Sequence, residues 1–451
     1  MTTNLDLALR AVELARRAGA EQCDAFLVAY DESNVTVRLG KTEKLIEASS
    51  RQLGLRVING GRTAVCSSSD LSDAALERLA RETVELATIS APDEHAGLPE
   101  PALLARATVD GLQLYDERLG ALTVDEKLGM TTACEQAAFD ADGRITNSDG
   151  ATLSTRAGEI SLANSLGFAA SYPHTRVSLA VEVMADDADG KKRNAYWYSA
   201  ERSLHRLLPP EEIGRIAARR AVGQIGARKV PTRQVPIVFE PMMAGRLLGD
   251  LASCVTGSAL YRQATFLAGR TGERVGSELL TVIDDPSIPA ASGSRPFDGE
   301  GVTASPRPLF TNGVFEGFLF DSYSARRTGN RSTGSANRGV ESSPSPGPSN
   351  LVLKGPRTVP VESLLKEIGE GLLVTELIGH GFNPTSGDWS RGAAGYWIEN
   401  GELAYPVTEV NVSGTLEAML AGVDAVGDDL TWFGAVAAPT LRIQGMTLSG
   451  L

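Results

Sequence analysis

The clearest fold information in the chain lies in Leu372–Pro406, which reads LLVTELIGHGFNPTSGDWSRGAAGYWIENGELAYP. An apolar segment opens this stretch, and alternating segments flank Asn400-Gly401 near its end. An Asn-Gly pair in that setting predicts a two-residue turn between antiparallel strands. The five glycines from Gly379 to Gly395 predict sharp turns or close approaches of the backbone. We therefore expect a hairpin beside a Gly-rich loop, and loops of this kind often line a site or an interface.

The sequence on either side extends this pattern through the second half. Val235–Phe239 is an apolar strand that runs directly into an amphipathic helix at about Met242–Leu251. A short helix is expected at about Val361–Gly369 and a closing strand at Pro439–Leu448. Residues 328–350 are rich in Gly, Ser, Pro and Asn and long for a surface loop, and we interpret them as a flexible loop.

The first half shows short alternating segments that predict a run of antiparallel strands, at 25–28, 35–39, 45–48, 53–57 and 63–66. Asn4 is predicted to be the N-cap of a first helix, and further helices are predicted to start at Asp70 or Ser72, at the capping box Thr123–Glu126 and at Pro209. Asp-Gly pairs predict turns at Asp142-Gly143, Asp149-Gly150 and Asp189-Gly190. A Pro- and Ala-rich linker is expected at about residues 93–107.

The main domain boundary is predicted at Arg228–Thr232, after the last helix of the first half. It divides the chain into an N-terminal domain, residues 1–229, and a β-rich C-terminal domain, residues 230–451. Helices and largely antiparallel sheet are expected in both, so the sequence predicts an α+β fold of two domains.

Charge and cysteine content limit the function classes. The 451 residues carry 56 acidic and 43 basic side chains, a net charge of −13, so we expect neither nucleic acid nor an anionic membrane as a partner. No apolar run reaches membrane-spanning length, and the first residues lack the basic and apolar parts of a signal peptide. The four cysteines form no CxxC pair, which is typical of a reducing compartment. We expect a cytoplasmic protein.

Several separate blocks of the sequence resemble the TldD/PmbA family. They are Arg51–Ser68 with Asp70-Leu71-Ser72, Ser342–Leu351, Gly369–Gly381, Ser386–Asp388, Tyr396–Gly401, Tyr405-Pro406 and Ala438–Thr447. The resemblance covers nearly the whole chain and is closest to the PmbA branch, also called TldE. It implies a relationship to zinc peptidases that act as pairs of related subunits, mature peptide precursors and degrade antitoxins. Older names call the family modulators of DNA gyrase.

In the TldD branch of this family, a His-Glu-x-x-x-His motif on a helix and a cysteine near the C-terminus bind the metal. The resemblance places Gly249 at the first histidine, Asp250 at the glutamate and Cys254 at the second histidine. Glycine offers no ligand, and the segment with the family's cysteine is absent. The chain's histidines are His95, His174, His205 and His380, and none pairs at HExxH spacing. Because a catalytic zinc needs three protein ligands, we expect neither a metal site nor catalytic residues in this chain.

Residues beside the Gly-rich loop are the remaining candidates. His380 would either contact substrate or donate a ring hydrogen bond to backbone in its own loop, and we favour the second interpretation. Arg391, Tyr396 and Trp397 are, with His380, the residues predicted to face a peptide or a partner.

The resemblance and the missing ligands together predict a non-catalytic subunit of a TldD-type zinc metallopeptidase complex that cleaves unfolded peptides. Zinc is then expected in the TldD-like partner and not in this chain. Two alternatives stay open: a stand-alone or metal-independent hydrolase with a site around Cys254, Asp250 or His380, and a homodimeric interaction or scaffold protein of the gyrase-modulator type. Whether the chain is itself an enzyme is left open by the sequence.

Overall fold

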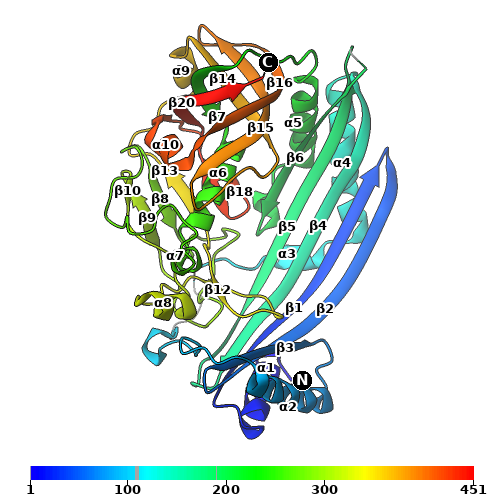
Figure 1. The fold of residues 1–451 in the computed structure, drawn as a ribbon. Helices are drawn as coiled ribbons and strands as arrows, with labels where there is room; N and C mark the ends of the chain where they lie inside the picture. The colour runs from blue at the N-terminus through cyan, green and yellow to red at the C-terminus, as the bar shows by residue number, and fades with distance from the viewer. Residues whose placement is uncertain (1, 107–110, 189, 451) are drawn as a thin grey trace.

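The computed structural model describes residues 2–106, 111–188 and 190–450. Helices and mostly antiparallel sheets occur in both halves of the chain, which confirms the predicted α+β fold (Figure 1). Ala107, at the end of the predicted linker, and Asp189, in the predicted Asp189-Gly190 turn, lie outside the described residues. Within the described ranges, no helix is long and apolar enough to cross a membrane.

The first half forms one antiparallel sheet of six strands, in the order β3-β2-β1-β4-β5-β6. The strands are β1 (Gln22–Arg38), β2 (Lys41–Asn59), β3 (Arg62–Ser68), β4 (Ile145–Asn164), β5 (Ala169–Asp186) and β6 (Lys192–Glu201). β1, β2, β4 and β5 are 17 to 20 residues long. In Figure 1 they extend along most of the molecule.

The separate strands predicted at 25–28 and 35–39, and at 45–48 and 53–57, are wrong as separate elements. Each pair belongs to one continuous strand, because the register of β1 and β2 runs from Gln22↔Ile58 to Arg38↔Lys41. Most residues between the predicted pieces are polar, and most of them line an open trough on the sheet. Side chains that face water in the middle of a strand need not alternate between apolar and polar. The alternating sequence pattern is therefore interrupted at residues where the strand itself continues.

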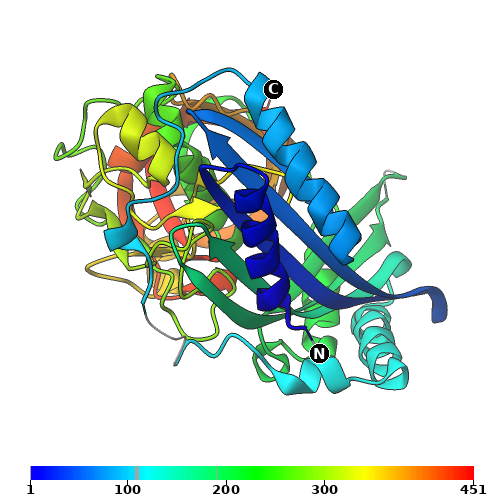
Figure 2. The same ribbon diagram turned by 90° about the horizontal axis from the view of Figure 1, so that it is seen from below.

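Helices cover the two ends of the trough face of this sheet. α1 (Asn4–Arg17) and α2 (Asp73–Ile89) pack together at one end, as Figure 2 shows from below. α4 (Val124–Ala141) and α5 (Pro210–Val222) pack together at the other end, with the short α3 (Glu117–Ala121) beside them. The trough between the two groups has a volume of about 1200 Å³.

The start of the first helix differs by one residue from the prediction. Thr3, not Asn4, is the N-cap of α1: its hydroxyl accepts a hydrogen bond from the Asp6 backbone N–H, and the Asp6 carboxylate accepts one from the Thr3 N–H. The predicted capping box at Thr123 and Glu126 is confirmed at the start of α4.

The second half contains two further six-stranded sheets, in the orders β10-β9-β8-β13-β19-β18 and β16-β15-β14-β7-β20-β17. The first consists of β8 (Thr281–Asp284), β9 (Arg307–Thr311), β10 (Val314–Phe315), β13 (Leu351–Lys354), β18 (Thr431–Phe433) and β19 (Val436–Ala438). The second consists of β7 (Arg233–Phe239), β14 (Glu370–Ile378), β15 (Asp388–Glu399), β16 (Glu402–Thr415), β17 (Val423–Val426) and β20 (Leu441–Ser449). A pairing of β16 with β20 closes β16, β15, β14, β7 and β20 into a ring.

The longer α6 and several short helices complete the helices of the described structure. They are η1 (Pro101–Leu103), η2 (Leu204–Arg206), α6 (Pro241–Cys254), α7 (Gly257–Tyr261), α8 (Ser322–Thr328), α9 (Val361–Lys366) and α10 (Leu416–Ala421). A two-stranded pairing joins β11 (Ala336–Asn337) to β12 (Ser345–Pro346). The core of the second half includes Phe239, Trp389 and Trp397 and unites both of its sheets with α6.

The predicted hairpin around Asn400-Gly401 is confirmed. Glu399 of β15 pairs with Glu402 of β16, and the two turn residues have φ angles of 53° and 82°. A type I′ turn requires both central residues to be in the left-handed region, and Asn-Gly favours this turn type. The predicted close approach of backbone also occurs, because a Cβ on Gly395 would lie 1.8 Å from the carbonyl oxygen of Leu373.

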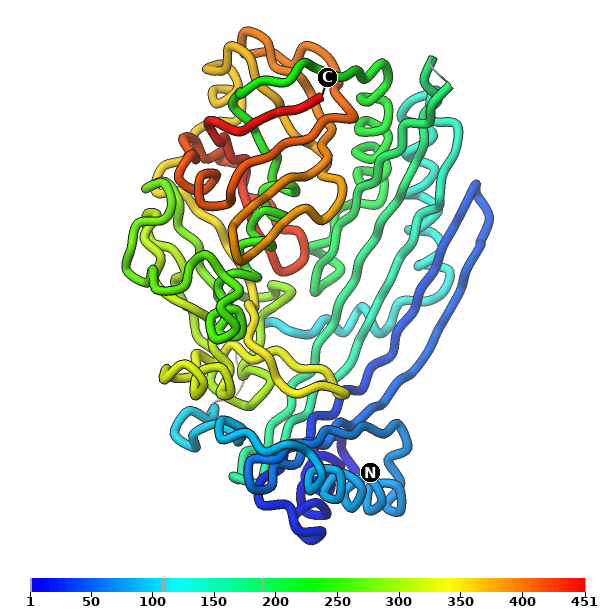
Figure 3. Tube along the Cα trace, viewed as in Figure 1, coloured from blue at the N-terminus to red at the C-terminus, as the bar shows by residue number. Residues whose placement is uncertain are grey.

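Residues 328–350, which we call the strap, are not the flexible loop that the sequence predicts. The strap contains β11 and β12 and crosses from the second half to the first sheet, where Figure 3 shows it in yellow against the blue strands. The strap packs closely against the sheet, since a Cβ on Gly54 of β2 would lie 1.8 Å from the carbonyl oxygen of Val340. Gln52 of β2 also donates a hydrogen bond to Glu341 of the strap at 3.0 Å. Burial of Arg338, which is 0% exposed, explains why a polar segment is held in place.

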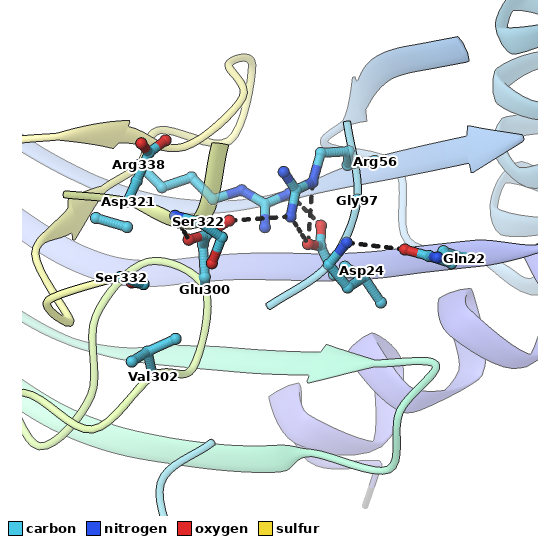
Figure 4. Close-up of polar contacts among 12 residues, drawn as sticks. Gln22, Asp24, Arg56, Gly97, Glu300, Val302, Asp321, Ser322, Ser332 and Arg338 are labelled. Atoms are coloured by element: carbon cyan, nitrogen blue, oxygen red, sulfur yellow. Dashed lines mark hydrogen bonds and ion pairs between the residues drawn. The ribbon is translucent and has the colours of Figure 1, made fainter. Parts of the chain in front are cut away.

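A buried group of charges lies where the strap meets the sheet (Figure 4). Arg338 forms an ion pair with Asp24 of β1, with 2.6 Å between Nη2 and Oδ1. Arg56 of β2 donates hydrogen bonds from Nε and Nη2 to the other oxygen of Asp24. Glu300 lies 3.8 Å from Arg56 and accepts a 2.8 Å hydrogen bond from the Ser322 N–H. These charges come from both halves of the chain, so they hold the halves together.

Candidate functional site

The helix that would carry the family's metal motif is α6. The apolar strand β7 leads into it directly, and Pro241 at its first position has no backbone N–H to leave unpaired. Its buried face includes Met243, Leu247 and Leu251, and it packs on β14, β18 and β19. The amphipathic helix predicted after Val235–Phe239 is therefore present. Of the positions of interest, Gly249 is exposed, Asp250 is partly buried and Cys254 is buried.

Two of the three degenerate positions offer no usable ligand. Gly249 has open space where a side chain would begin, so a histidine would fit there but none is present. The Cys254 thiol is fully buried and donates a 3.7 Å hydrogen bond to the Asp250 carbonyl oxygen. Burial raises the pKa of Cys254 to about 11, so the thiol is neutral at pH 7 and a poor nucleophile.

The third position, Asp250, is held in a charged hydrogen-bonded contact. Arg391 Nη2 donates to both carboxylate oxygens, at 2.8 and 2.9 Å, and the indole N–H of Trp389 donates at 2.9 Å. Both donors come from β15. Burial raises the pKa of Asp250, while the hydrogen bond from Trp389 and the charge of Arg391 act in the opposite direction. A carboxylate occupied in this way is poorly placed to act as a general base.

These residues do not fit a catalytic zinc. Such a site needs three ligands from His, Cys, Asp or Glu and an open position. At the three motif positions stand a glycine, a carboxylate already bonded to an arginine, and a buried neutral thiol. Across the described part of the chain, no group of three or more His, Cys, Asp or Glu side chains is arranged to hold a metal.

His380 lies at an exposed position in the Gly-rich loop. It is close enough to Asp250 for its charge to lower the pKa of that carboxyl group. The hydrogen bond that we expected from its ring to the loop backbone is not formed: the loop is closed instead by backbone bonds, such as the one from Phe382 N–H to the His380 carbonyl oxygen at 3.0 Å. The structure thus places the exposed His380 near the largely buried pair of Asp250 and Arg391, whose side chains are 14% and 9% exposed.

The two aromatic candidates on β15 lie elsewhere. Trp397 is 2% exposed and belongs to the core, with Arg233 stacked 5.3 Å from its ring. A residue this deeply buried offers no surface to a partner in the structure as it stands. Tyr396 is half-buried and faces the junction between the two halves, where a Cβ on Gly223 of α5 would lie 2.0 Å from its hydroxyl.

Two charged contacts near the candidate site and the junction are not predictable from the sequence. One is Asp250 with Arg391, which lie 141 residues apart. The other is Arg220 of α5 with Glu240, which forms two hydrogen bonds of 2.9 and 2.7 Å across the junction. The sequence shows only that a charged residue lies among apolar ones, as Glu240 does directly after β7. It does not indicate which residue forms the ion pair with it.

The Asp250–Arg391 pair gives a testable prediction. Arg391→Met leaves a largely buried carboxylate with Trp389 alone, so we expect the free energy of unfolding at pH 7 to fall by about 2 kcal/mol. The double variant Asp250→Asn/Arg391→Met should recover part of this loss, since no charge is then left unpaired. Urea unfolding of the two single variants and the double variant measures the coupling. Losses that simply add would contradict the ion pair.

Comparison with known proteins places the chain in a family. Family models for PmbA/TldA metallopeptidase domain 1, the central domain and the C-terminal domain match residues 23–87, 117–225 and 232–450. The chain belongs to the PmbA/TldD family. In this member of the PmbA/TldD family, the first two models fall on strands and helices of one continuous six-stranded sheet.

Other PmbA/TldD proteins resemble the chain along nearly their full length. The metalloprotease PmbA of Escherichia coli O157:H7 is 34% identical over 443 residues, which cover 96% of this chain and 95% of that protein. A metalloprotease PmbA homologue of Haemophilus influenzae is 33% identical over 440 residues, covering 98% and 94%.

Solved structures of this family agree in fold. A candidate modulator of DNA gyrase from Bacteroides thetaiotaomicron superposes with a TM-score of 0.92 at 29% identity, covering 100% of both chains. TldE from Thermococcus kodakarensis has a TM-score of 0.87 at 21% identity, covering 97% of this chain and 99% of that one, which shows a shared fold alone.

Proposed function

We propose that this chain is a non-catalytic subunit of a peptidase complex, paired with a TldD-like subunit that carries zinc. The observation that supports the proposal most directly is the Asp250 carboxylate, which accepts hydrogen bonds from Arg391 and Trp389 at the position where the resemblance expects a catalytic glutamate. Gly249 and the neutral Cys254 at the two histidine positions point the same way. In this proposal the complex acts in the cytoplasm on unfolded peptides, and neither nucleic acid nor a membrane is involved.

The chain's own contribution would be binding and enclosure. The distal part of β2 offers a free edge, because β3 pairs only with Leu53–Asn59 and leaves Lys41–Gln52 bonded on one side, to β1. Nine successive residues of this segment, 41–49, are exposed, and Leu45 and Ile46 remain 45% and 41% exposed. A free edge with exposed apolar residues favours the addition of an extended peptide as a further strand. Residues 47–51 also line the large trough.

The stand-alone hydrolase built on Cys254 receives no support from the geometry. A fully buried thiol with a pKa of about 11 can be neither reached nor ionised at neutral pH.

The decisive experiment measures zinc content and peptidase activity for this chain alone, for a TldD-like subunit from the same organism, and for their mixture. We expect zinc in the partner alone and in the mixture, and cleavage of an unfolded peptide that is strongest in a stable complex of both. The variant Asp250→Asn should leave the activity of the complex unchanged, because the carboxylate takes no part in chemistry. Stoichiometric zinc and chelator-sensitive cleavage by this chain alone would overturn the proposal.

The free edge of β2 can be tested by proline substitution. Successive backbone N–H groups of a strand point to opposite sides, so of Leu45 and Ile46 one faces β1 and the other faces the free edge. We expect one of Leu45→Pro and Ile46→Pro to weaken binding of a labelled unfolded peptide several-fold while the thermal transition stays in place, and the other to lower stability. Fluorescence anisotropy and thermal unfolding report the two effects. Ile89→Lys, at the exposed last residue of α2, is the control, and unchanged peptide binding in both proline variants would exclude this edge.

A further inference from the structure

A cavity of about 310 Å³ lies at the junction between the two halves, apart from the Asp250 area. The first half contributes α5 and β6, and the second half contributes the start of α6 with β14, β15 and the start of β16 (Figure 1). Pockets between domains are frequent sites for small molecules, and this volume is at the lower end of the usual range for ligands.

On one wall of the cavity, the charged side chains already have hydrogen-bond partners within the protein, so their role is structural. Arg220 donates two hydrogen bonds to Glu240 and a third, of 2.5 Å, to the carbonyl oxygen of Thr375. Its guanidinium also lies 5.0 Å from the ring of Trp197. With all of these contacts made inside the protein, Arg220 and Glu240 shape the cavity and have little capacity left for a ligand.

Three other polar side chains line the cavity without a partner. The Glu376 carboxylate, the Arg219 guanidinium and the Tyr396 hydroxyl form no hydrogen bond or ion pair with any described residue. Burial raises the pKa of Glu376, against the opposing charges of Arg220 and Arg246. A carboxylate partly removed from water and left unpaired gains strongly from a cationic hydrogen-bond donor.

The rest of the lining is mixed: Asn194, Gln224 and Tyr196 are polar but already form hydrogen bonds within the protein, and the other part is apolar. Met242, Met243, Leu373 and Leu403 line the cavity beside the three polar groups. Met242 and Met243 open α6, and methionine side chains adapt readily to apolar groups of different shape. The cavity therefore offers one free negative charge, one free positive charge, a hydroxyl and an adaptable apolar surface.

We propose that this cavity binds a small zwitterion with an apolar side chain, namely a free amino acid or a dipeptide with unblocked ends. The ammonium group is bound by Glu376 and the Tyr396 hydroxyl, the carboxylate by Arg219, and the side chain by the methionines and leucines. The two free charges of opposite sign favour such a ligand over a simple cation or anion. The inference goes beyond the proposed function and does not depend on it, since the chain alone forms the cavity.

The test is calorimetric titration of the full chain with Leu-Leu at pH 7. We expect saturable binding of the free dipeptide, and at least tenfold weaker binding of N-acetyl-Leu-Leu and of Leu-Leu amide, because each loses one charged contact. The proposal would be overturned if binding did not saturate up to 10 mM, roughly the weakest affinity that a useful small-molecule site would show. Equal binding of the blocked peptides would also overturn it.

Variants locate the binding to this cavity. Glu376→Gln should weaken Leu-Leu binding about tenfold or more and remove the preference for a free amino end, and Arg219→Gln should remove the preference for a free carboxyl end. The matched controls are Glu370→Gln on the same strand and Arg215→Gln on the same helix, whose ion pairs lie on the surface. Circular dichroism and thermal unfolding verify that each variant folds. Binding unchanged in folded Glu376→Gln, or weakened equally by the controls, would contradict the site.

Discussion

Replacement of Asp24 by asparagine is expected to lower the free energy of unfolding by about 3–5 kcal/mol, the loss typical of removing one charge from a buried ion pair. Asp24 is 2% exposed and is the carboxylate that both Arg56 and Arg338 contact. Asparagine keeps the size of the side chain but not its charge, so two buried guanidinium groups would lose their shared counterion. Urea unfolding followed by circular dichroism measures the loss.

Asp149→Asn is the matched control for this substitution. Asp149 is exposed and lies 4.0 Å from Arg38, and exposed pairs contribute little, so its loss should stay within about 0.5 kcal/mol. Because the cluster joins the two halves, the Asp24 variant should also unfold in a broader or split transition. A cooperative transition with the stability of the native chain would show that the cluster does not hold the halves together.

Glu300→Gln is expected to change how stability depends on pH. Burial raises the pKa of Glu300 to about 7; Arg56 lowers it, and Asp298 and Asp321 raise it. The fold thus favours the protonated carboxyl. The stability that this preference contributes is present in full below pH 4.5, the ordinary pKa of Glu, and is lost as the pH rises to about 7. The difference between the two pKa values corresponds to about 3 kcal/mol of stability, and relaxation of the neighbouring charges offsets some of it.

Glutamine is the permanently neutral form of this side chain and can still accept the hydrogen bond from the Ser322 N–H. We therefore expect the variant and the native chain to be similarly stable near pH 4.5 and the variant to be more stable by up to about 3 kcal/mol at pH 8. Urea unfolding at pH 4.5, 6, 7 and 8 provides the comparison. Parallel curves for the two proteins would mean that Glu300 is already ionised at low pH.

Much of the fold follows from local sequence, and the reasons are visible at particular residues. The Asn400-Gly401 turn forms because both residues tolerate a left-handed backbone, a property of the dipeptide itself. The capping box at Thr123 and Glu126 is equally local. The β1 and β2 strands were harder to delimit, because their middle residues face a trough and lack the apolar alternation on which strand prediction rests.

The candidate site is predictable only in part. Residue type alone predicts that Gly249 cannot bind a metal and that Cys254 is a thiol. It does not predict the partner of Asp250, because Arg391 lies 141 residues away in the sequence. The order of the strap is not predictable for the same reason: its Gly, Ser and Pro content is typical of a mobile loop, and the contacts that hold it, such as Arg338 with Asp24, are with strands of the other half. Trp397, interpreted from its position beside the loop, lies in the core because it follows the inward face of β15.

The position of the strap also bears on how the protein is made. Asp24 and Arg56 leave the ribosome early, whereas Arg338 is synthesised roughly 300 residues later, an interval of about 15–60 s at ordinary elongation rates. Once β6 has been synthesised, in the later part of that interval, the nascent first sheet has its strands but not its cover, and the surface that Val340 later occupies beside Gly54 stays open. Release of a finished N-terminal segment before the strap exists would leave that surface exposed to other chains in the cell. Slow translation downstream of β6, or a shortage of chaperones, should therefore harm the yield of this protein more than that of a chain whose first domain closes on its own.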